Sequence, residues 1–236
     1  SFAKITSNVD SLLKLGISVS IRINTDPYTM ERADELLDYF KEKGWLQYQN
    51  FKAYYALLRK EVPIKGENGE YSKEMFTQSS FFCTYLQKGL EKQGCGKVMC
   101  QDYSVRSVLT NMLLGKSTPY KSHFCGAQSG MIIFDPLGDI YSCWDVVGQR
   151  EYRVGHYMPD FVLEDTFADK WFDSRVSKFS CIKCKYVLFC GGGCLANAIR
   201  TTGNLQSGTC NDYPRLFNAE IKYIYNEKIK KGIDEN

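Results

Sequence analysis

Ten cysteines are the residues of this 236-residue chain whose type and number point most directly to chemistry. Seven of them fall in the second half of the sequence, from position 125 to position 210. Cysteine thiolates are the usual ligands of iron–sulfur clusters, four to each cubane, so seven or eight are enough for two clusters. The ten are Cys83, Cys95, Cys100, Cys125, Cys143, Cys181, Cys184, Cys190, Cys194 and Cys210.

The spacing of the cysteines favours iron–sulfur clusters but leaves two alternatives open. The order is Cys125-x12-Gly138-x4-Cys143, then Cys181-x2-Cys184-x5-Cys190-x3-Cys194, and then Cys210. A pair separated by two residues lets a loop turn around one metal centre, and the glycines at 191–193 let the backbone pass close to inorganic sulfide. A four-cysteine zinc site would suit the same spacing. Disulfides are disfavoured because no secretion signal opens the chain.

The segment from Cys125 to Cys210 resembles the SPASM domain that is appended to radical S-adenosylmethionine (SAM) enzymes. The resemblance rests on seven cysteines in order, with Gly138 and the Gly-Gly-Gly-Cys at 191–194. It implies that the distal of two auxiliary [4Fe–4S] clusters is held by Cys181, Cys184, Cys190 and Cys210. It implies that the proximal cluster is held by Cys125, Cys143 and Cys194.

The fourth ligand of the proximal cluster is not fixed by the resemblance. Residues 116–124 contain no cysteine. Cys100 is our candidate, with Cys95, His123 or an open coordination position as alternatives. A lone histidine beside a ligand is more often structural, so His123 is the least favoured of these.

The sequence lacks the Cys-x3-Cys-x2-Cys motif that holds the SAM-cleaving cluster in radical SAM enzymes. We therefore expect the chain to be the carboxy-terminal portion of a longer enzyme. We also expect it to be inactive alone, because only the full-length protein would bind SAM and the third [4Fe–4S] cluster, which cleaves SAM. The absence of an initial Met fits this interpretation.

Arg22 and Asn24 lie at the end of a predicted strand, where binding sites in parallel α/β folds gather, and they are candidates for binding SAM. A solvated Arg22 is an equally good interpretation.

The resemblance also bears on the reaction. In sulfatase-maturing relatives an Asp directly follows the second hairpin cysteine and acts as a general base. Here Trp144 follows Cys143, and Asp145 comes one residue later. On a strand this shift would turn the carboxylate to the opposite face, so formylglycine formation is disfavoured.

Peptide or protein maturation is the preferred function, by analogy with the family, and aromatic residues such as Trp144 and Trp171 could line a peptide groove. The alternative is a non-catalytic electron-transfer or substrate-binding module.

The first sixty residues must supply an α/β scaffold for these sites. Hydrophobic periodicity predicts helices over 5–15 and 30–43, each ended by a glycine, and strands over 17–24 and 51–58. Strand pairs linked by helices form parallel sheets, so this part resembles the second half of a partial radical SAM (β/α) barrel. An edge left open where the rest of the barrel belongs would permit a dimer.

The remaining elements are a polar loop over 59–73, a helix over 75–92, a β-hairpin over 130–145, a short helix over 164–177 and an amphipathic helix over 211–231. They suggest three segments: a barrel half at 1–60, a linker and helix at 61–115, and a small α+β SPASM domain at 116–236.

Composition restricts the partners. The net charge of +3 comes from mixed basic and acidic residues, which gives no reason to expect nucleic acid or an anionic membrane. No stretch of the sequence is long and apolar enough to span a membrane. Clustered cysteines without a signal peptide are typical of a reducing compartment, so we expect a cytoplasmic protein with a peptide or protein substrate.

Overall fold

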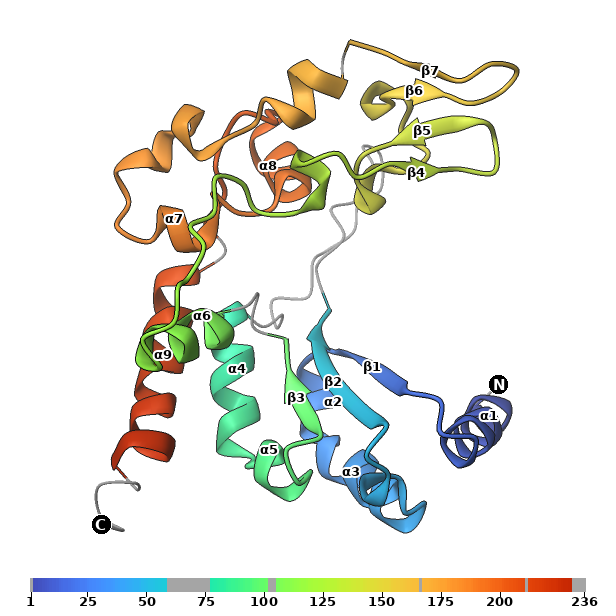
Figure 1. The fold of residues 1–236 in the computed structure, drawn as a ribbon, viewed down its shortest axis with the longest axis vertical. Coiled ribbons are helices and arrows are strands. Elements are labelled where there is room, and N and C mark those ends of the chain that lie inside the picture. Colours follow the sequence, from blue (N-terminus) through green and yellow to red (C-terminus); the bar gives the residue numbers. More distant parts are fainter. Residues whose placement is uncertain (1, 59–76, 102–104, 166, 211, 231–236) are drawn as a thin grey trace. The chain divides into compact units, whose positions relative to one another are not determined.

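The computed structural model describes residues 2–58, 77–101, 105–165, 167–210 and 212–230, which Figure 1 draws as a coloured ribbon. Contacts group the chain into two compact units, one formed by 1–109 with 215–236 and the other by 110–214. This division differs from the expected one in grouping the carboxy-terminal helix with the first half of the chain. The polar loop expected over 59–73 lies outside the described residues. Among the helices that are described, none has the length and apolar character needed to cross a membrane.

The first unit is built on a three-stranded parallel sheet. Strand β1 (Val19–Thr25) pairs with β2 (Phe51–Leu57), which pairs with β3 (Val98–Cys100). The parallel pairing expected for the first two strands is confirmed, with Val19 opposite Phe51 and Thr25 opposite Leu57. The third strand was not expected, because it is too short to show a pattern in the sequence.

The central strand β2 is the best buried. Phe51, Ala53, Tyr55 and Ala56 are all fully shielded from solvent, as expected of a strand covered on both faces. Strand β1 is an edge of the described sheet, and its exposed positions alternate with more buried ones.

Helices follow and cover these strands. The first unit contains α1 (Phe2–Lys14), α2 (Pro27–Glu31), α3 (Ala33–Glu42), a 3-10 turn (Trp45–Gln47), α4 (Gln78–Gln87), α5 (Leu90–Gln93), α6 (Val105–Leu113) and α9 (Tyr213–Ile224), which continues as a π-helical segment (Tyr225–Lys230). The division between the units falls inside two helices. It lies between positions 109 and 110 in α6 and between positions 214 and 215 in α9.

Two single helices expected from periodicity are each divided. The helix expected over 30–43 is α2 and α3, separated at Arg32. The helix expected over 75–92 is α4 and α5, and Gly89 between them has a φ of 63° that helical backbone does not allow. Thr77 and Ser80 form a capping box at the start of α4.

The second unit contains a four-stranded antiparallel sheet in the order β4-β5-β6-β7. Its strands are short: β4 (Ile133–Phe134), β5 (Asp139–Tyr141), β6 (Gly155–His156) and β7 (Val162–Leu163). The hairpin expected over 130–145 is present as β4 and β5, because Asp135 accepts hydrogen bonds from the backbone N–H groups of Leu137 and Asp139 and so closes the turn.

The rest of the second unit consists of short helical turns. The α-helices are α7 (Val187–Cys190) and α8 (Leu195–Thr202). Turns of 3-10 helix span Gly126–Gln128, Trp144–Val146, Arg150–Tyr152, Val176–Lys178 and Ser180–Lys183. The helix expected over 164–177 is only a π-helical segment at Phe167–Phe172.

A hydrophobic core that includes Tyr141, Trp171, Phe179 and Leu195 joins the sheet to these turns. Trp171 is fully buried and therefore cannot line a peptide groove.

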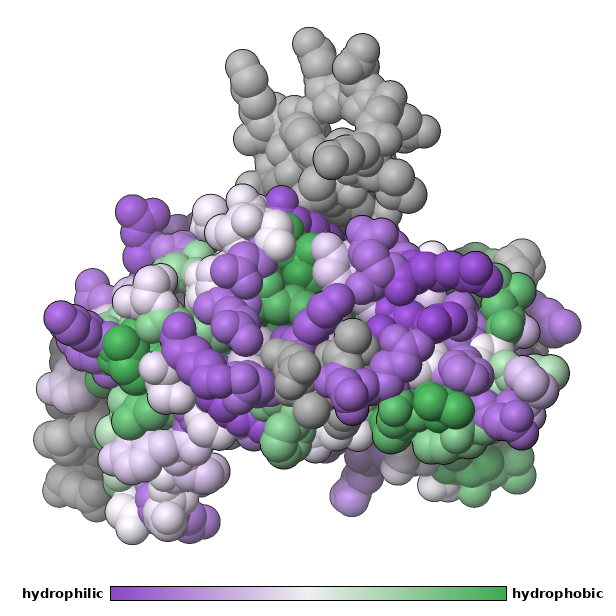
Figure 2. Space-filling model, turned by 90° about the horizontal axis from the view of Figure 1, so that it is seen from above, coloured by the Kyte–Doolittle hydropathy of each residue, from purple (hydrophilic) through white to green (hydrophobic). Residues whose placement is uncertain are grey.

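Large apolar side chains remain exposed around the antiparallel sheet. Phe134, Leu137, Met158 and Phe161 are each more than half exposed. In Figure 2 hydrophobic residues form several separate groups on the face that is shown, among mostly hydrophilic ones. Exposed apolar clusters of this kind are common at interaction sites.

Candidate metal centre

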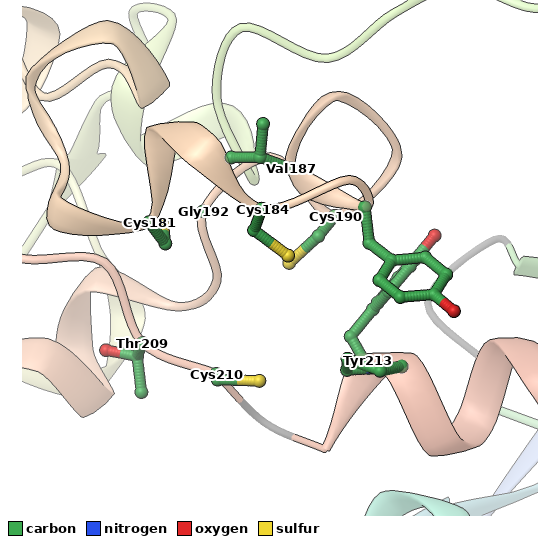
Figure 3. Close-up of a pocket in the computed structure, with 10 residues that line it drawn as sticks. Cys181, Cys184, Val187, Cys190, Gly192, Thr209, Cys210 and Tyr213 are labelled. Atoms are coloured by element: carbon green, nitrogen blue, oxygen red, sulfur yellow. The ribbon is translucent and has the colours of Figure 1, made fainter.

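Four of the cysteines line one cavity in the second unit. They are Cys181, Cys184, Cys190 and Cys210, the set that the family resemblance assigns to the distal cluster. Figure 3 shows Cys184 and Cys190 on one side of this space and Cys210 on the other. We call it the four-cysteine pocket; Tyr186, Val187, Gly192, Thr209, Tyr213 and Pro214 complete its lining.

Three separate segments bring these thiols together. Cys181 lies in the 3-10 turn Ser180–Lys183, and Cys184 caps the end of that turn. Cys190 is the last residue of α7. Cys210 belongs to the segment after α8, which is attached to the glycine run by a 2.8 Å hydrogen bond from Thr209 N to Gly192 O.

The thiols of this pocket affect one another. Burial, with smaller contributions from Cys210 and Cys181, raises the pKa of Cys190 to about 11, although the backbone N–H of Gly192 and the charge of Lys121 act to lower it. Burial also raises the pKa of Cys181, and Cys184 and Cys210 contribute in the same direction. Cys181 and Cys190 are therefore protonated at neutral pH in the metal-free chain, and binding a metal must displace their protons.

A second group of thiols consists of Cys125, Cys143 and Cys194, the set assigned to the proximal cluster. Cys143 and Cys194 are buried in the core of the second unit, and Cys125 packs against it. Burial raises the pKa of Cys143 to about 12; the backbone N–H of Asp145 opposes this, while the Asp145 carboxylate, Cys194 and Cys125 add to it. The three thiols thus belong to the same hydrophobic cluster of the second unit.

Gln128 positions Cys125, and sequence reasoning missed it. Its side-chain oxygen accepts hydrogen bonds from the backbone N–H groups of Phe124 (2.9 Å) and Cys125 (3.4 Å), and its amide nitrogen donates to Ser174 O at 2.6 Å. Gln128 is fully buried. The signal available in the sequence was a glutamine three residues after a turn-starting residue, which is a capping pattern.

The glycine run separates the two groups of thiols. Gly191, Gly192 and Gly193 all have φ between 76° and 84°, a region that favours glycine, so helix α7 ends at Cys190 and α8 starts only after Cys194. The path from Cys190 to Cys194 is therefore not helical. A Cβ on these glycines would strike protein atoms of His123, Phe179 and Thr209, respectively, and their expected close approach to sulfide stays a prediction.

A further glycine contacts the four-cysteine pocket directly. A Cβ on Gly208 would lie 2.5 Å from the sulfur of Cys181. Glycine is thus required at position 208 for Cys181 to occupy its place, a feature that sequence reasoning did not single out.

The candidates for the fourth proximal ligand lie in different parts of the chain. Cys100 is buried at the end of β3 in the first unit, with its sulfur 3.7 Å from Gln101 O, and Cys95 is exposed in the same unit. His123, in the second unit, has its Nδ1 2.9 Å from the Ser122 hydroxyl. Burial lowers the pKa of His123, and the charge of Arg175 lowers it further, so the ring is neutral at neutral pH. The assignment of Cys100 stays a prediction.

Arg22 and Asn24 share one face of β1 near its carboxyl end. Both side chains are exposed, and Arg22 Nε donates to Asn24 Oδ1 at 3.0 Å. Arg22 therefore bonds to the second candidate, and it has no acidic partner among the residues that the structure describes. Their role toward SAM stays a prediction.

Asp145 does not lie on a strand, contrary to expectation. Residues Trp144–Val146 form a 3-10 turn and not a strand, so the alternation of faces used to disfavour formylglycine formation does not apply. The Asp145 carboxylate lies 3.9 Å from Arg200, and Trp144 is 70% exposed.

No group of three His, Cys, Asp or Glu side chains in the described part of the chain is close enough to bind a single metal ion. Four of the thiols line a cavity, and the other three lie in the core of the second unit or pack against it.

Known proteins with a similar fold were found among solved structures. A structure of native anSMEcpe with bound AdoMet matches 95% of this chain with a TM-score of 0.55 and 18% sequence identity. The crystal structure of SuiB from Streptococcus suis matches 85% of the chain with a TM-score of 0.53 and 15% identity. No model of a protein family matches the sequence, and no curated protein is significantly similar to it.

At these identities the likeness is one of fold. The chain therefore has the fold of the corresponding part of these two proteins, with its parallel α/β sheet followed by the cysteine-bearing unit. It covers 59% of anSMEcpe and 47% of SuiB, so it spans about half to three fifths of their lengths.

Proposed function

We propose that this chain is the auxiliary-cluster portion of a radical SAM enzyme, and that the full-length enzyme modifies a peptide or protein. In this proposal the four-cysteine pocket holds the distal [4Fe–4S] cluster, and Cys125, Cys143 and Cys194 hold the proximal one. The observation that carries the proposal is the separation of seven cysteines into these two groups.

The chemistry of the donors fits such clusters. All seven side chains are thiols, the soft ligands that iron–sulfur clusters require. Four of them line one common cavity, which is the number of thiolates that a cubane cluster takes. Val187, Tyr186, Tyr213 and Pro214 supply apolar and aromatic lining, while Cys184 and Cys210 are exposed to solvent.

The similar structures support the class. Both anSMEcpe and SuiB are radical SAM maturases, the former solved with AdoMet. A cluster bound in such a site supplies electron transfer or a coordination position for substrate. The chain's own residues hold and orient it: Gln128 fixes the backbone at Cys125, and the glycine run directs Cys190 and Cys194 apart.

A peptide substrate suits the surface of the second unit. Exposed apolar side chains at Phe134, Leu137, Met158 and Phe161 adjoin the hairpin that carries Cys143, and Trp144 is exposed beside that cysteine. Apolar side chains of an extended peptide can pack on such a surface.

Anaerobic reconstitution tests the proposal. We expect the brown protein to contain about eight irons per chain, with the absorption of [4Fe–4S] clusters. Two zinc sites would instead leave the protein colourless with about two zinc ions per chain, and that result would overturn the proposal.

A further inference from the structure

Strand β7 is an edge of the antiparallel sheet, and no other strand of the described residues covers its outer side. It pairs only with β6, and the order of the sheet ends at β7. Figure 1 shows β7 as the outermost of the four strands. An exposed edge offers N–H and C=O groups to a further strand, and proteins commonly protect such edges with Lys or Pro. Residues 161–163 include neither, so the edge is open to a partner.

The register between β6 and β7 turns the backbone N–H and C=O of Leu163 to the free side. Glu164 N–H donates to Val154 O at 2.9 Å, so these two residues form a hydrogen-bonded pair. The next pair along the ladder is Leu163 opposite Gly155. Because bonded and non-bonded pairs alternate in antiparallel sheets, Leu163 directs its backbone groups away from β6, and so does Phe161. These two residues can therefore bond to an added strand without any loss from the existing ladder.

The side chains of β7 and of the residue before it are apolar and exposed. Phe161, Val162 and Leu163 are 58%, 41% and 40% exposed, although neighbours in a strand point to opposite faces. Met158 extends this apolar surface to the first hairpin, since a Cβ on Gly138 in its turn would lie 3.2 Å from the Met158 Cβ. Aromatic and β-branched side chains of this kind make the cross-strand contacts that stabilise a paired strand.

Acidic residues flank the apolar centre of this edge. Asp160 and Asp165 are exposed, and neither forms an ion pair within the part of the chain that the structure describes. Glu164 is already paired with Arg153 at 2.7 Å. The wider segment 135–173 contains nine Asp or Glu and only three Lys or Arg. The edge therefore attracts a basic partner.

We propose that β7 binds an extended basic peptide segment as a fifth strand of the sheet. The backbone of the peptide bonds to Phe161 and Leu163, its apolar side chains pack beside Val162 and Leu163, and its Lys or Arg residues lie opposite Asp160 and Asp165. Addition of a strand to a sheet edge is a common mode of peptide recognition. The inference deepens the proposed function and rests on it for one point, that the bound segment belongs to the peptide substrate.

The charges argue against a second copy of the chain as the occupant of this edge. If two β7 strands paired antiparallel about the centre of 162–163, each Asp160 would lie opposite an Asp165. Like charges directly opposite one another destabilise a strand pair. The same carboxylates would be repelled by an anionic membrane surface.

Three peptides with blocked termini test the binding mode. The probe is Lys-Thr-Val-Ile-Tyr-Lys, whose two lysines would lie opposite Asp160 and Asp165. A second peptide has Glu in place of both lysines. A third keeps all side chains of the probe but is N-methylated at Val and Tyr, so it lacks the backbone donors that would face Leu163 and Phe161.

Two variants of the reconstituted chain test the site. Asp160→Lys/Asp165→Lys reverses the charges of the edge, and its matched control is Glu31→Lys/Glu42→Lys, which makes the same charge change at exposed positions of the first unit. Fluorescence anisotropy measures binding at about 0.01 M and about 0.1 M salt, where the Debye length falls from about 30 Å to about 10 Å. Iron content is measured on every sample.

We expect the lysine peptide to bind the parent chain, and to bind more weakly at the higher salt. The glutamate peptide and the N-methylated peptide should each bind roughly tenfold more weakly or worse. Asp160→Lys/Asp165→Lys should prefer the glutamate peptide, a result that also shows the edge to be folded in this variant. The control variant should keep the parent affinity to within about twofold.

Several results would overturn the proposal. Equal binding of the N-methylated peptide would mean that side chains pack without strand addition, and equal weakening in both variants would place the binding elsewhere. Dimerisation of the parent chain that Leu163→Pro abolishes would make a second copy the occupant, and binding to phosphatidylcholine vesicles in place of the peptides would make it a lipid surface. Absence of iron with peptide binding intact would overturn the proposed function instead, and would leave the binding edge without a role toward substrate.

Discussion

At the scale of single residues, the two thiol groups make a prediction about which cluster each cysteine holds. Cys190 lies in the four-cysteine pocket and Cys194 in the buried group, although only three residues separate them. We expect Cys190→Ala to remove the distal cluster and spare the proximal one, and Cys194→Ala to do the reverse. Iron counting with Mössbauer spectroscopy on each reconstituted variant checks this. Loss of the same cluster in both variants would show that the assignment is wrong.

A second prediction concerns the protonation of the thiols before metal binds. Burial raises the pKa of Cys143 to about 12 and that of Cys190 to about 11, so both are neutral thiols at pH 7 and become thiolates only as pH approaches those values. Because iodoacetamide reacts with the thiolate, alkylation of the metal-free, reduced chain should be slow at pH 7 and rise about tenfold per pH unit.

Mass spectrometry of digested peptides measures these rates, with the exposed Cys95 as the internal control. Alkylation of Cys143 at pH 7 as fast as that of Cys95 would contradict the prediction.

From the sequence, the cysteines could be recognised as candidate metal ligands. The family resemblance then assigned them to two clusters. Spacing did not distinguish Cys190 from Cys194, because loops fold back over distances that spacing does not encode. Gln128 was hidden for a different reason: its role depends on Ser174, which lies far along the chain. The partners of such a side chain are set by the tertiary fold.

At the scale of elements, the turn between α7 and α8 gives a prediction about glycine. Gly193 and Gly203 have similar left-handed backbone, with φ of 83° and 69°. A Cβ on Gly193 would strike the carbonyl of Thr209, whereas one on Gly203 meets open space. Both Ala variants should lose about 1–2 kcal/mol of unfolding free energy from backbone strain, and Gly193→Ala should lose more.

Urea denaturation of the two variants isolates the clash, since the strain is common to both. Equal losses would show that the Thr209 segment moves freely away from the glycine run.

The start of α2 gives a prediction about capping. Asp26 precedes Pro27 and accepts a 2.8 Å hydrogen bond from Thr29 N, which lowers the pKa of its carboxyl group. Asp26→Ala should reduce the unfolding free energy by about 1 kcal/mol at neutral pH. Because the folded-state pKa is lowered, this contribution is present above the ordinary value of 3.8 and is lost as pH falls through the folded-state value.

Thermal unfolding at pH 7 and at pH 3 measures both effects, and Asp38→Ala is the control because Asp38 forms only an exposed ion pair with Lys41. A loss that is equal at the two pH values would contradict a role for the charged cap.

Elements with a clear period were predictable, and short ones were not. Strands β1 and β2 carry enough β-branched and apolar residues to be recognised, and their parallel pairing follows from the helices between them. Strand β3 has three residues and depends on β2 for its existence. The turn at Trp144–Val146 was misread as a strand because it directly continues the hairpin.

At the scale of the whole molecule, the sequence predicts what the chain cannot do alone. It contains no Cys-x3-Cys-x2-Cys motif, and it covers 59% and 47% of two proteins that share its fold. If the proposed function is correct, the seven cysteines of the second unit are occupied by auxiliary clusters. The reconstituted chain should therefore release no 5′-deoxyadenosine from SAM and dithionite, even when it contains about eight irons.

Chromatography of the reaction mixture measures the product, and a full-length enzyme that includes the missing motif serves as the positive control. Cleavage of SAM by the isolated chain would mean that one of its clusters has an iron open to SAM. That result would place SAM chemistry in the second unit and would remove the reason for assigning Arg22 and Asn24 to SAM. Failure of the full-length enzyme to cleave SAM would count instead against the radical SAM class, since the missing motif would then be present and loaded. The two outcomes separate an error about this chain's clusters from an error about the enzyme to which it belongs.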